Sequence, residues 1–262
     1  MATGLLLIGI GRATKLLTFL VGCDKAYTAT IRLGQSTITD DAEGDVQDAP
    51  GAVDVDPQLL LRAIGELTGD IEQVPSSVSA IKVNGVRSYA RVRGGEQVEL
   101  KPRPVVVSRF EVLNQRSTRT EGLPVVDLDV EVEVGSGTYI RALARDLGSA
   151  LGTGGHLIAL RRNRIGRFEV ADGKELGELS QRHAEGAALP VVALADVARS
   201  QFPVRKLSQE EERDLRHGKR IDTGRPHTGP VAGLGPDGDL VAILDESEST
   251  TRSIVVFPLL PD

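Results

Sequence analysis

VDLDVEVEV (Val126–Val134) is the stretch that decides the fold class of this 262-residue chain, together with the GSGTYIR of Gly135–Arg141 directly after it. Within Val126–Val134 apolar and acidic side chains alternate strictly. This alternation predicts a strand with one face in a core and the other in water. After the glycine turn, apolar residues recur at helical spacing, which predicts a helix over residues 139–151.

Further strands and helices surround this pair. We expect three strands from alternation or from short apolar runs: residues 5–9, 25–34 and 156–162. We expect helices over residues 13–21 and 56–67, the second with Asp56 as its N-cap and Pro57 in its first turn. Strands and helices do not follow a regular βαβ period, so the predicted class is α+β, with a mixed and mainly antiparallel sheet.

The composition of the chain changes near residues 189–202. Ser208-Gln209-Glu210-Glu211 is a capping-box pattern, which predicts a helix that runs to His217. Short apolar runs between glycine and proline turns follow it and indicate strands. We therefore expect two domains, a larger one over 1–199 and a small β-rich one over 200–262.

The charge of the chain is unevenly distributed, although its net value is −6. Residues 37–75 carry ten acidic groups and one basic group, whereas residues 80–110 carry seven basic and two acidic groups. Residues 156–167 hold four arginines and no acid. Because salt screens distant charges, such local basic patches can bind a polyanion on an acidic protein. The alternative is a solvated surface with scattered charge.

Compartment and membrane signals are weak. A single cysteine, Cys23, excludes an internal disulfide and fits a reducing compartment, so we expect a cytoplasmic protein. No apolar run reaches the length of about 18 residues that a membrane helix needs. A competing interpretation is a lipoprotein signal, with Arg12 and Lys15 ahead of an apolar run that ends at Cys23. That run has an apolar core of only about seven residues, which is short for a signal peptide.

Common catalytic patterns are absent from the sequence. Gly4 and Gly9 have the glycine spacing of a phosphate-binding loop, but Ile10 stands where the lysine belongs. The four histidines are far apart in the sequence and lack metal-ligand spacing, and no Gly-x-Ser-x-Gly segment occurs. We therefore expect neither a metal nor a cofactor of these classes.

Three polar residues in apolar segments are candidates for chemistry. Arg141 lies in the first turn of the predicted helix, where an unpaired guanidinium is too costly to bury, so it should hold a carboxylate or a phosphate. Tyr27 lies in the middle of a predicted strand in a chain with only 3% aromatic residues. Tyr27 and Tyr139 are either stacking surfaces for a nucleic-acid base or core residues with a satisfied hydroxyl.

Several motifs occur together in a specific order. They are MATG (Met1–Gly4), GRATK (Gly11–Lys15), DKAY (Asp24–Tyr27), RLG (Arg32–Gly34), PS (Pro75–Ser76), SAIK (Ser79–Lys82), NG (Asn84–Gly85), GTYIR (Gly137–Arg141) and HLIALRR (His156–Arg162). With these motifs the chain resembles the TruB-type tRNA pseudouridine synthases, which isomerise uridine-55 in the T arm of tRNA. The resemblance extends to about residue 170. The C-terminal module resembles PUA-like RNA-binding domains more loosely.

The resemblance implies the pseudouridine synthase fold, a monomer that acts on the T arm of tRNA, and a reaction without metal or cofactor. The target uracil would be flipped out of its stack, detached, rotated and reattached. Arg141 would pair with a catalytic aspartate and orient it, Tyr27 would lie against the flipped base, and Tyr139 and Leu160 would line the pocket. Basic residues would contact phosphates and position the RNA: Lys82, Arg87, Arg91, Arg161, Arg162 and Arg164.

The resemblance also places the nucleophilic aspartate two positions before Met1. On this basis we expect the start to have been assigned at an internal methionine. We expect residues 1–262 alone to be inactive, and the absence of N-terminal strands to expose an edge of the sheet. The alternative is a catalytically inactive tRNA-binding protein or folding chaperone.

Overall fold

The computed structural model describes residues 2–76, 82–83, 86–87, 100–224 and 226–258. The chain divides into two compact units. We call them the sheet unit, formed by Met1–Leu6 and Val21–Asp172, and the terminal unit, formed by Leu7–Leu20 and Gly173–Asp262. This division differs from the expected boundary at 199/200, because residues 7–20 and 173–199 group with the C-terminal residues.

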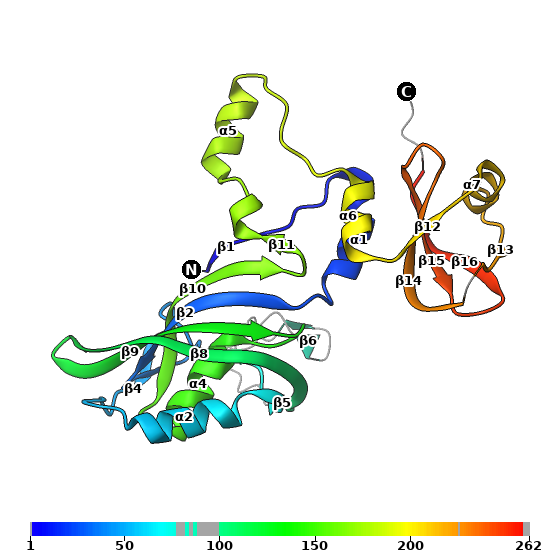
Figure 1. The fold of residues 1–262 in the computed structure, drawn as a ribbon. Helices are drawn as coiled ribbons and strands as arrows, with labels where there is room; N and C mark the ends of the chain where they lie inside the picture. Colours follow the sequence, from blue (N-terminus) through cyan, green and yellow to red (C-terminus); the bar gives the residue numbers. More distant parts are fainter. Residues whose placement is uncertain (1, 77–81, 84–85, 88–99, 225, 259–262) are drawn as a thin grey trace. The chain divides into compact units, whose positions relative to one another are not determined.

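The sheet unit is built on one mixed sheet (Figure 1). Within the described residues its strands are β1 (Thr3–Gly4), β2 (Lys25–Leu33), β5 (Gly69–Gln73), β8 (Arg103–Thr120), β9 (Leu123–Val134), β10 (Gly155–Ile165) and β11 (Phe168–Glu169). Their order is β1-β10-β2-β9-β8-β5, and β11 pairs with β10. Only the short β1–β10 pair is parallel among these pairings. The predicted class, α+β with a mainly antiparallel sheet, is confirmed.

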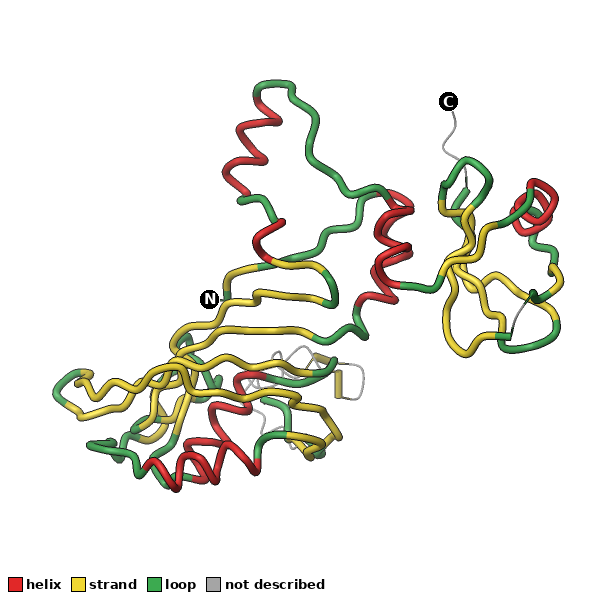
Figure 2. The backbone as a smooth tube through the Cα atoms, in the orientation of Figure 1, coloured by secondary structure: helices red, strands yellow, loops and turns green. Residues whose placement is uncertain are grey.

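Smaller elements surround this sheet. They are the two-stranded pairs β3 (Ser36–Thr37) with β4 (Val46–Asp48) and β6 (Lys82–Val83) with β7 (Val86–Arg87), and the 3-10 turn η2 (Val170–Asp172). The β6–β7 pairing lies on both sides of Asn84 and Gly85, which are themselves outside the described residues. Figure 2 shows β8 and β9 as a long hairpin.

Strand β9 forms the centre of the core, as its alternation predicts. It pairs with β2 on one side and β8 on the other, and the side chains of Val126, Leu128, Val130 and Val132 are fully buried. Helices α2 (Pro57–Glu66) and α4 (Ile140–Ala150) pack into the same apolar cluster and lie on one side of the sheet (Figure 1). Asp56 caps α2 as predicted, since its side chain accepts a hydrogen bond from the Gln58 N–H at 2.8 Å.

The other face of β9 differs from the expectation of a face in water. Asp127 is only 6% exposed and accepts two hydrogen bonds of 2.8 Å from the Arg32 guanidinium on β2. Asp129 is hydrogen-bonded by Thr30 and paired with Arg116. The acidic residues face cations on the neighbouring strands, and opposite charges across strands stabilise a sheet.

Helix α4 lies in backbone contact with strand β10. A Cβ atom on Gly148 would lie 2.2 Å from the Gly154 carbonyl carbon and the Gly155 nitrogen. A Cβ atom on Gly155 would lie 2.5 Å from the Ala144 carbonyl oxygen. Only glycine permits this approach at the two positions.

The prediction of a strand over Leu5–Gly9 is wrong. Pairing in β1 is limited to Thr3 and Gly4, which lie opposite Arg161 and Arg162, and one further hydrogen bond joins the Leu5 N–H to the Arg162 carbonyl. The described strands offer no partner to residues 6–10, so a short apolar run does not form a ladder there. The side chains of Leu6, Ile8 and Ile10 are exposed.

The terminal unit contains a second, five-stranded sheet. Its strands are β12 (Val204–Lys206), β13 (Ile221–Asp222), β14 (His227–Leu234), β15 (Leu240–Glu246) and β16 (Thr250–Val256), in the order β12-β14-β15-β16-β13. Its helices are η1 (Gly11–Ala13), α1 (Thr14–Leu20), α5 (Leu176–Ala184), α6 (Leu194–Gln201) and α7 (Gln209–Arg216). Ser208 and Glu211 form the predicted capping box at the start of α7. The small β-rich C-terminal module is thus confirmed.

None of the described helices is both long and apolar enough to cross a membrane.

Candidate functional site

Arg141 lies in the first turn of α4 and holds a carboxylate, as the sequence predicts. Its Nη1 donates to Asp41 Oδ2 at 2.9 Å and to the Thr39 carbonyl oxygen at 3.2 Å. The two side chains are 25% and 24% exposed, so the pair is largely but not fully removed from water. A charge-assisted hydrogen bond in such a half-buried place is stronger than one on the surface.

A tight loop over residues 37–41 positions Asp41. Thr39 Oγ1 donates to Asp41 Oδ1 at 2.6 Å, and Thr37 Oγ1 donates to the Asp41 carbonyl at 2.7 Å. Burial alone would raise the pKa of Asp41, but hydrogen bonds from Thr39 and the Glu43 N–H and the charge of Arg141 lower that pKa below its usual value. Asp41 is therefore ionised near neutral pH and is a stable partner for Arg141.

The side chain of Gln73 binds the backbone at the start of α4. Its Oε1 accepts from the Tyr139 N–H at 2.8 Å, and its Nε2 donates to the Tyr139 carbonyl at 3.2 Å. Tyr139 is the N-cap residue of α4 and its own side chain makes no capping hydrogen bond. The Gln73 side chain, at the end of β5 and 1% exposed, thus binds the two peptide groups on either side of Tyr139, where the helix begins.

Tyr27 and Leu160 lie on one face of two neighbouring strands. In the β2–β10 register Tyr27 is opposite Arg162 and Ala29 is opposite Leu160, so Tyr27 and Leu160 are diagonal neighbours. Both are partly buried and pack against the core cluster that contains α4. The site predicted from Tyr27, Tyr139, Arg141 and Leu160 is therefore distributed over the α4 side of the sheet and the helix start.

The predicted basic residues divide between the two faces of β10. Arg162 shares the face of Tyr27, and its Nε donates to the Leu5 carbonyl at 2.7 Å. Arg161 lies opposite Thr28 on the other face, and Arg164 pairs there with Asp24 at 2.6 Å and with Glu133 at 2.8 Å. The side chains of Lys82 and Arg87, and Arg91 as a whole, lie outside the described residues. The phosphate contacts of all six remain predictions.

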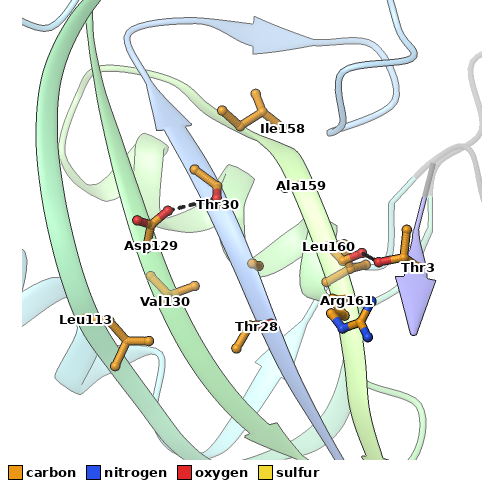
Figure 3. A pocket seen from close by; sticks show the side chains of 11 residues that line it. Thr3, Thr28, Thr30, Leu113, Asp129, Val130, Ile158, Ala159, Leu160 and Arg161 are labelled. Carbon is orange, nitrogen blue, oxygen red and sulfur yellow. Dashed lines mark hydrogen bonds between the residues drawn. The ribbon is translucent and has the colours of Figure 1, made fainter. Parts of the chain in front are cut away.

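A pocket of about 310 Å³ opens over strands β2, β9 and β10. Figure 3 shows its lining, in which Thr30 Oγ1 donates to Asp129 at 2.9 Å and Thr3 Oγ1 donates to the Leu160 carbonyl at 3.4 Å. Leu160 and Arg161 border it, but Tyr27, Tyr139 and Arg141 do not. We therefore place the candidate site at the α4 start and not in this pocket.

The arrangement can orient a carboxylate and support a planar ring. Among the described residues, no three His, Cys, Asp or Glu side chains gather as metal ligands do. Asp41 and Gln73 are the residues that sequence reasoning did not single out. The carboxylate partner of Arg141 lies 100 residues away in sequence, within an acidic stretch that shows no motif of its own.

Comparisons with known proteins identify the family of this chain. The family model described as "TruB family pseudouridylate synthase (N terminal domain)" matches residues 1–140. Models described as "tRNA pseudouridylate synthase B C-terminal domain" and "tRNA Pseudouridine synthase II, C terminal" match residues 141–197 and 202–258.

Two similar curated proteins carry the same name. "tRNA pseudouridine synthase B" of Paenarthrobacter aurescens (strain TC1) is 50% identical over 266 residues, covering 98% of this chain and 83% of that protein. The protein of the same name from Mycobacterium ulcerans (strain Agy99) is 46% identical over 256 residues, covering 98% and 82%. The solved structure "Crystal Structure of a Cbf5-Nop10-Gar1 Complex" matches with a TM-score of 0.61 at 21% identity, covering 95% of this chain and 70% of that chain.

Proposed function

We propose, because this chain belongs to the TruB family of pseudouridylate synthases, that it converts uridine-55 in the T arm of tRNA to pseudouridine. Membership makes it an RNA-binding isomerase of tRNA processing. The observation that supports the finer assignment is the Arg141–Asp41 pair, which lies at the start of α4 on the side of the sheet that carries Tyr27 and Leu160.

The reaction is an isomerisation in which atoms and electrons balance within the substrate. The bond from the ribose C1′ to N1 of uracil breaks, and a bond from C1′ to C5 forms. The proton on C5 is lost, and N1 ends with one hydrogen. No oxidant or reductant is consumed. Protein groups that position the base and stabilise charge can therefore supply the catalysis that the reaction needs.

Each site residue has a role that its position supports. We assign to Arg141 the orientation of the nucleophilic carboxylate, since its guanidinium is half-buried and already bonded to a carboxylate in this structure. Tyr27 would lie against the flipped uracil, and Leu160 beside it would complete an apolar wall. Tyr139 would line the space for the flipped uracil from the start of α4.

The test of Arg141 compares turnover with binding. tRNA labelled with tritium at C5 of uridine releases tritium on each turnover, and filter binding gives the affinity. In an N-terminally extended polypeptide that supplies the nucleophilic aspartate, we expect Arg141→Ala to lower the rate constant by about a hundredfold, because the carboxylate loses the group that orients it, and to leave tRNA affinity within about twofold. Arg62→Ala on the exposed side of α2 serves as control. Equal losses in rate and affinity would mean that Arg141 is only structural.

The nucleophile is tested separately. The resemblance places it before Met1, so we expect a polypeptide of residues 1–262 to bind T-arm RNA without isomerising it, and an N-terminally extended polypeptide that supplies the aspartate to be active. Absence of turnover in the extended polypeptide would favour the alternative, a tRNA-binding protein or folding chaperone. Turnover by residues 1–262 alone would require another carboxylate.

Further proposals concern the substrate specificity, the oligomeric state and the cellular location of the protein. A tRNA with cytidine in place of uridine-55 should bind and not react. Binding should weaken as salt rises, because phosphate contacts release counterions. We propose that the protein acts as a monomer, to be measured by light scattering with and without tRNA. Because tRNA is the substrate, we also propose a cytoplasmic location.

A further inference from the structure

Two adjacent carboxylates face two arginines that lie one turn apart on α4. Asp41 pairs with Arg141 at 2.9 Å, and Asp40 pairs with Arg145 at 3.3 Å. Residues four apart in sequence share one side of a helix, so both arginines project toward the same loop. The loop and the helix are thus joined at two points, of which only the first involves Arg141.

The backbone of Asp40 makes this double pairing possible. In an extended segment consecutive side chains point to opposite sides. Asp40 instead has φ of 59°, in the left-handed region that aspartate tolerates better than most residues. Its N–H donates to the Thr37 carbonyl at 3.2 Å, and its carbonyl accepts from the Leu157 N–H at 3.0 Å. The loop is therefore fixed to β10, the strand that carries Leu160.

Arg145 connects three segments of the sheet unit. Besides Asp40, its guanidinium donates to the Val74 carbonyl at 2.7 Å, just after β5, and to Asp146 Oδ1 at 2.9 Å on its own helix. The Asp40 side chain is only 11% exposed. Burial raises the pKa of Asp40, and the charge of Arg145 opposes that rise. Arg145 is thus the first of several groups that favour the ionised form of Asp40, with a hydrogen bond from Ser76 and the charge of Arg141.

We propose that Asp40 and Arg145 form a positioning pair, which holds the loop over residues 37–41 against α4 and so fixes the orientation of the Arg141 guanidinium for the reaction. Neither residue touches the substrate. They act through Asp41, which is next to Asp40 in sequence, and through the helix turn that separates Arg145 from Arg141. The inference deepens the proposed function and rests on it.

The consequence for the reaction is a separation of rate from affinity. When the pair is broken, the loop and α4 keep Asp41–Arg141 as their direct ionic link, and the Arg141 guanidinium gains freedom to rotate. A positioned group that is misplaced by up to about 1 Å slows a reaction by about tenfold to a hundredfold. RNA binding depends on phosphate contacts spread over a larger surface, so it should change little.

The experiment uses Asp40→Asn, Arg145→Met and their double variant in the extended polypeptide used for turnover, with Asp146→Asn as control, since Asp146 contacts Arg145 without contacting the loop. Each protein is measured for single-turnover rate, for tRNA affinity and for the NMR resonance of Arg141 Nε. We expect each single variant to lower the rate about tenfold to a hundredfold with affinity within about twofold. The Arg141 resonance should shift in both, and Arg145→Lys should recover part of the rate.

The double variant separates a pair from two independent residues. We expect it to be no slower than the worse single variant, because residues that act as one unit are not additive. Additive losses, an unmoved Arg141 resonance, or affinity that falls as much as the rate would overturn the proposal. Where Arg145→Met does not fold, Asp40→Asn and Arg145→Lys carry the test. If no polypeptide turns over, the proposed function fails, while the resonance of Arg141 still decides whether the pair positions it.

Discussion

Replacing Gln73 with leucine tests how the start of α4 is fixed. Leucine fills a similar space but removes both hydrogen bonds to Tyr139, one accepted from its N–H and one donated to its carbonyl. A buried polar group that loses its partner costs about 1–3 kcal/mol, so the two groups together cost about 2–6 kcal/mol. Tyr139 is only partly buried and water can reach it, which places our expectation at the lower end, about 2 kcal/mol.

The assay is thermal unfolding of the sheet unit, followed by circular dichroism. A loss of about 2 kcal/mol in a unit of this size lowers Tm by about 4–8 °C. Hydrogen exchange at the Tyr139 amide should quicken in the same variant. Gln58→Leu, at an exposed position of α2, is the matched control and should change Tm by less than about 1 °C. A fall in Tm no larger than that of the control, or unchanged exchange at Tyr139, would refute the reasoning.

Three further outcomes can be measured. Arg32→Ala leaves its 6% exposed carboxylate partner on β9 unpaired and should cost about 3 kcal/mol in urea unfolding; a loss under about 1 kcal/mol would contradict this. Ser208→Ala removes the cap of α7 and should cost about 1 kcal/mol, seen in the transition of the terminal unit and not in that of the sheet unit. Hydrogen bonds from the Ser247 hydroxyl and Arg252 lower the pKa of Asp245 to about 2. Asp245 therefore adds stability above pH 3.8 that is lost as pH falls toward 2; NMR titration should show this pKa, and Asp245→Asn should remove the dependence.

The central part of the fold was predictable because its pattern of buried and exposed residues is visible within a short stretch of sequence. Strict alternation in Val126–Val134 identifies a strand with one apolar face, and the helix after it follows from apolar spacing. The cap at Asp56 is equally local. The prediction over Leu5–Gly9 failed because an apolar run becomes a strand only where a partner strand continues beside it. The apolar run itself does not show whether such a partner strand exists.

The candidate site was predictable only in part, for a similar reason. Arg141 needs an anionic partner wherever its helix is buried, so the need for a carboxylate or a phosphate could be predicted. The identity of the partner was not, because Asp41 lies among ten acidic residues over 37–75 that look alike in sequence. Gln73 was also missed, since a buried amide that binds a distant peptide group has no local signature.

The backbone contact between Gly148 and Gly155 limits which sequences can preserve this site. Elsewhere in the core, a change of side-chain size can be absorbed when neighbours adopt other rotamers and helices shift slightly. At this contact there is no side chain to adjust, since a Cβ atom at either position would overlap main-chain atoms. The two glycines therefore set the spacing between the helix that carries Arg141 and the strand that carries Leu160. A residue larger than glycine at position 148 or 155 would separate the two halves of the site without altering any residue that meets the substrate.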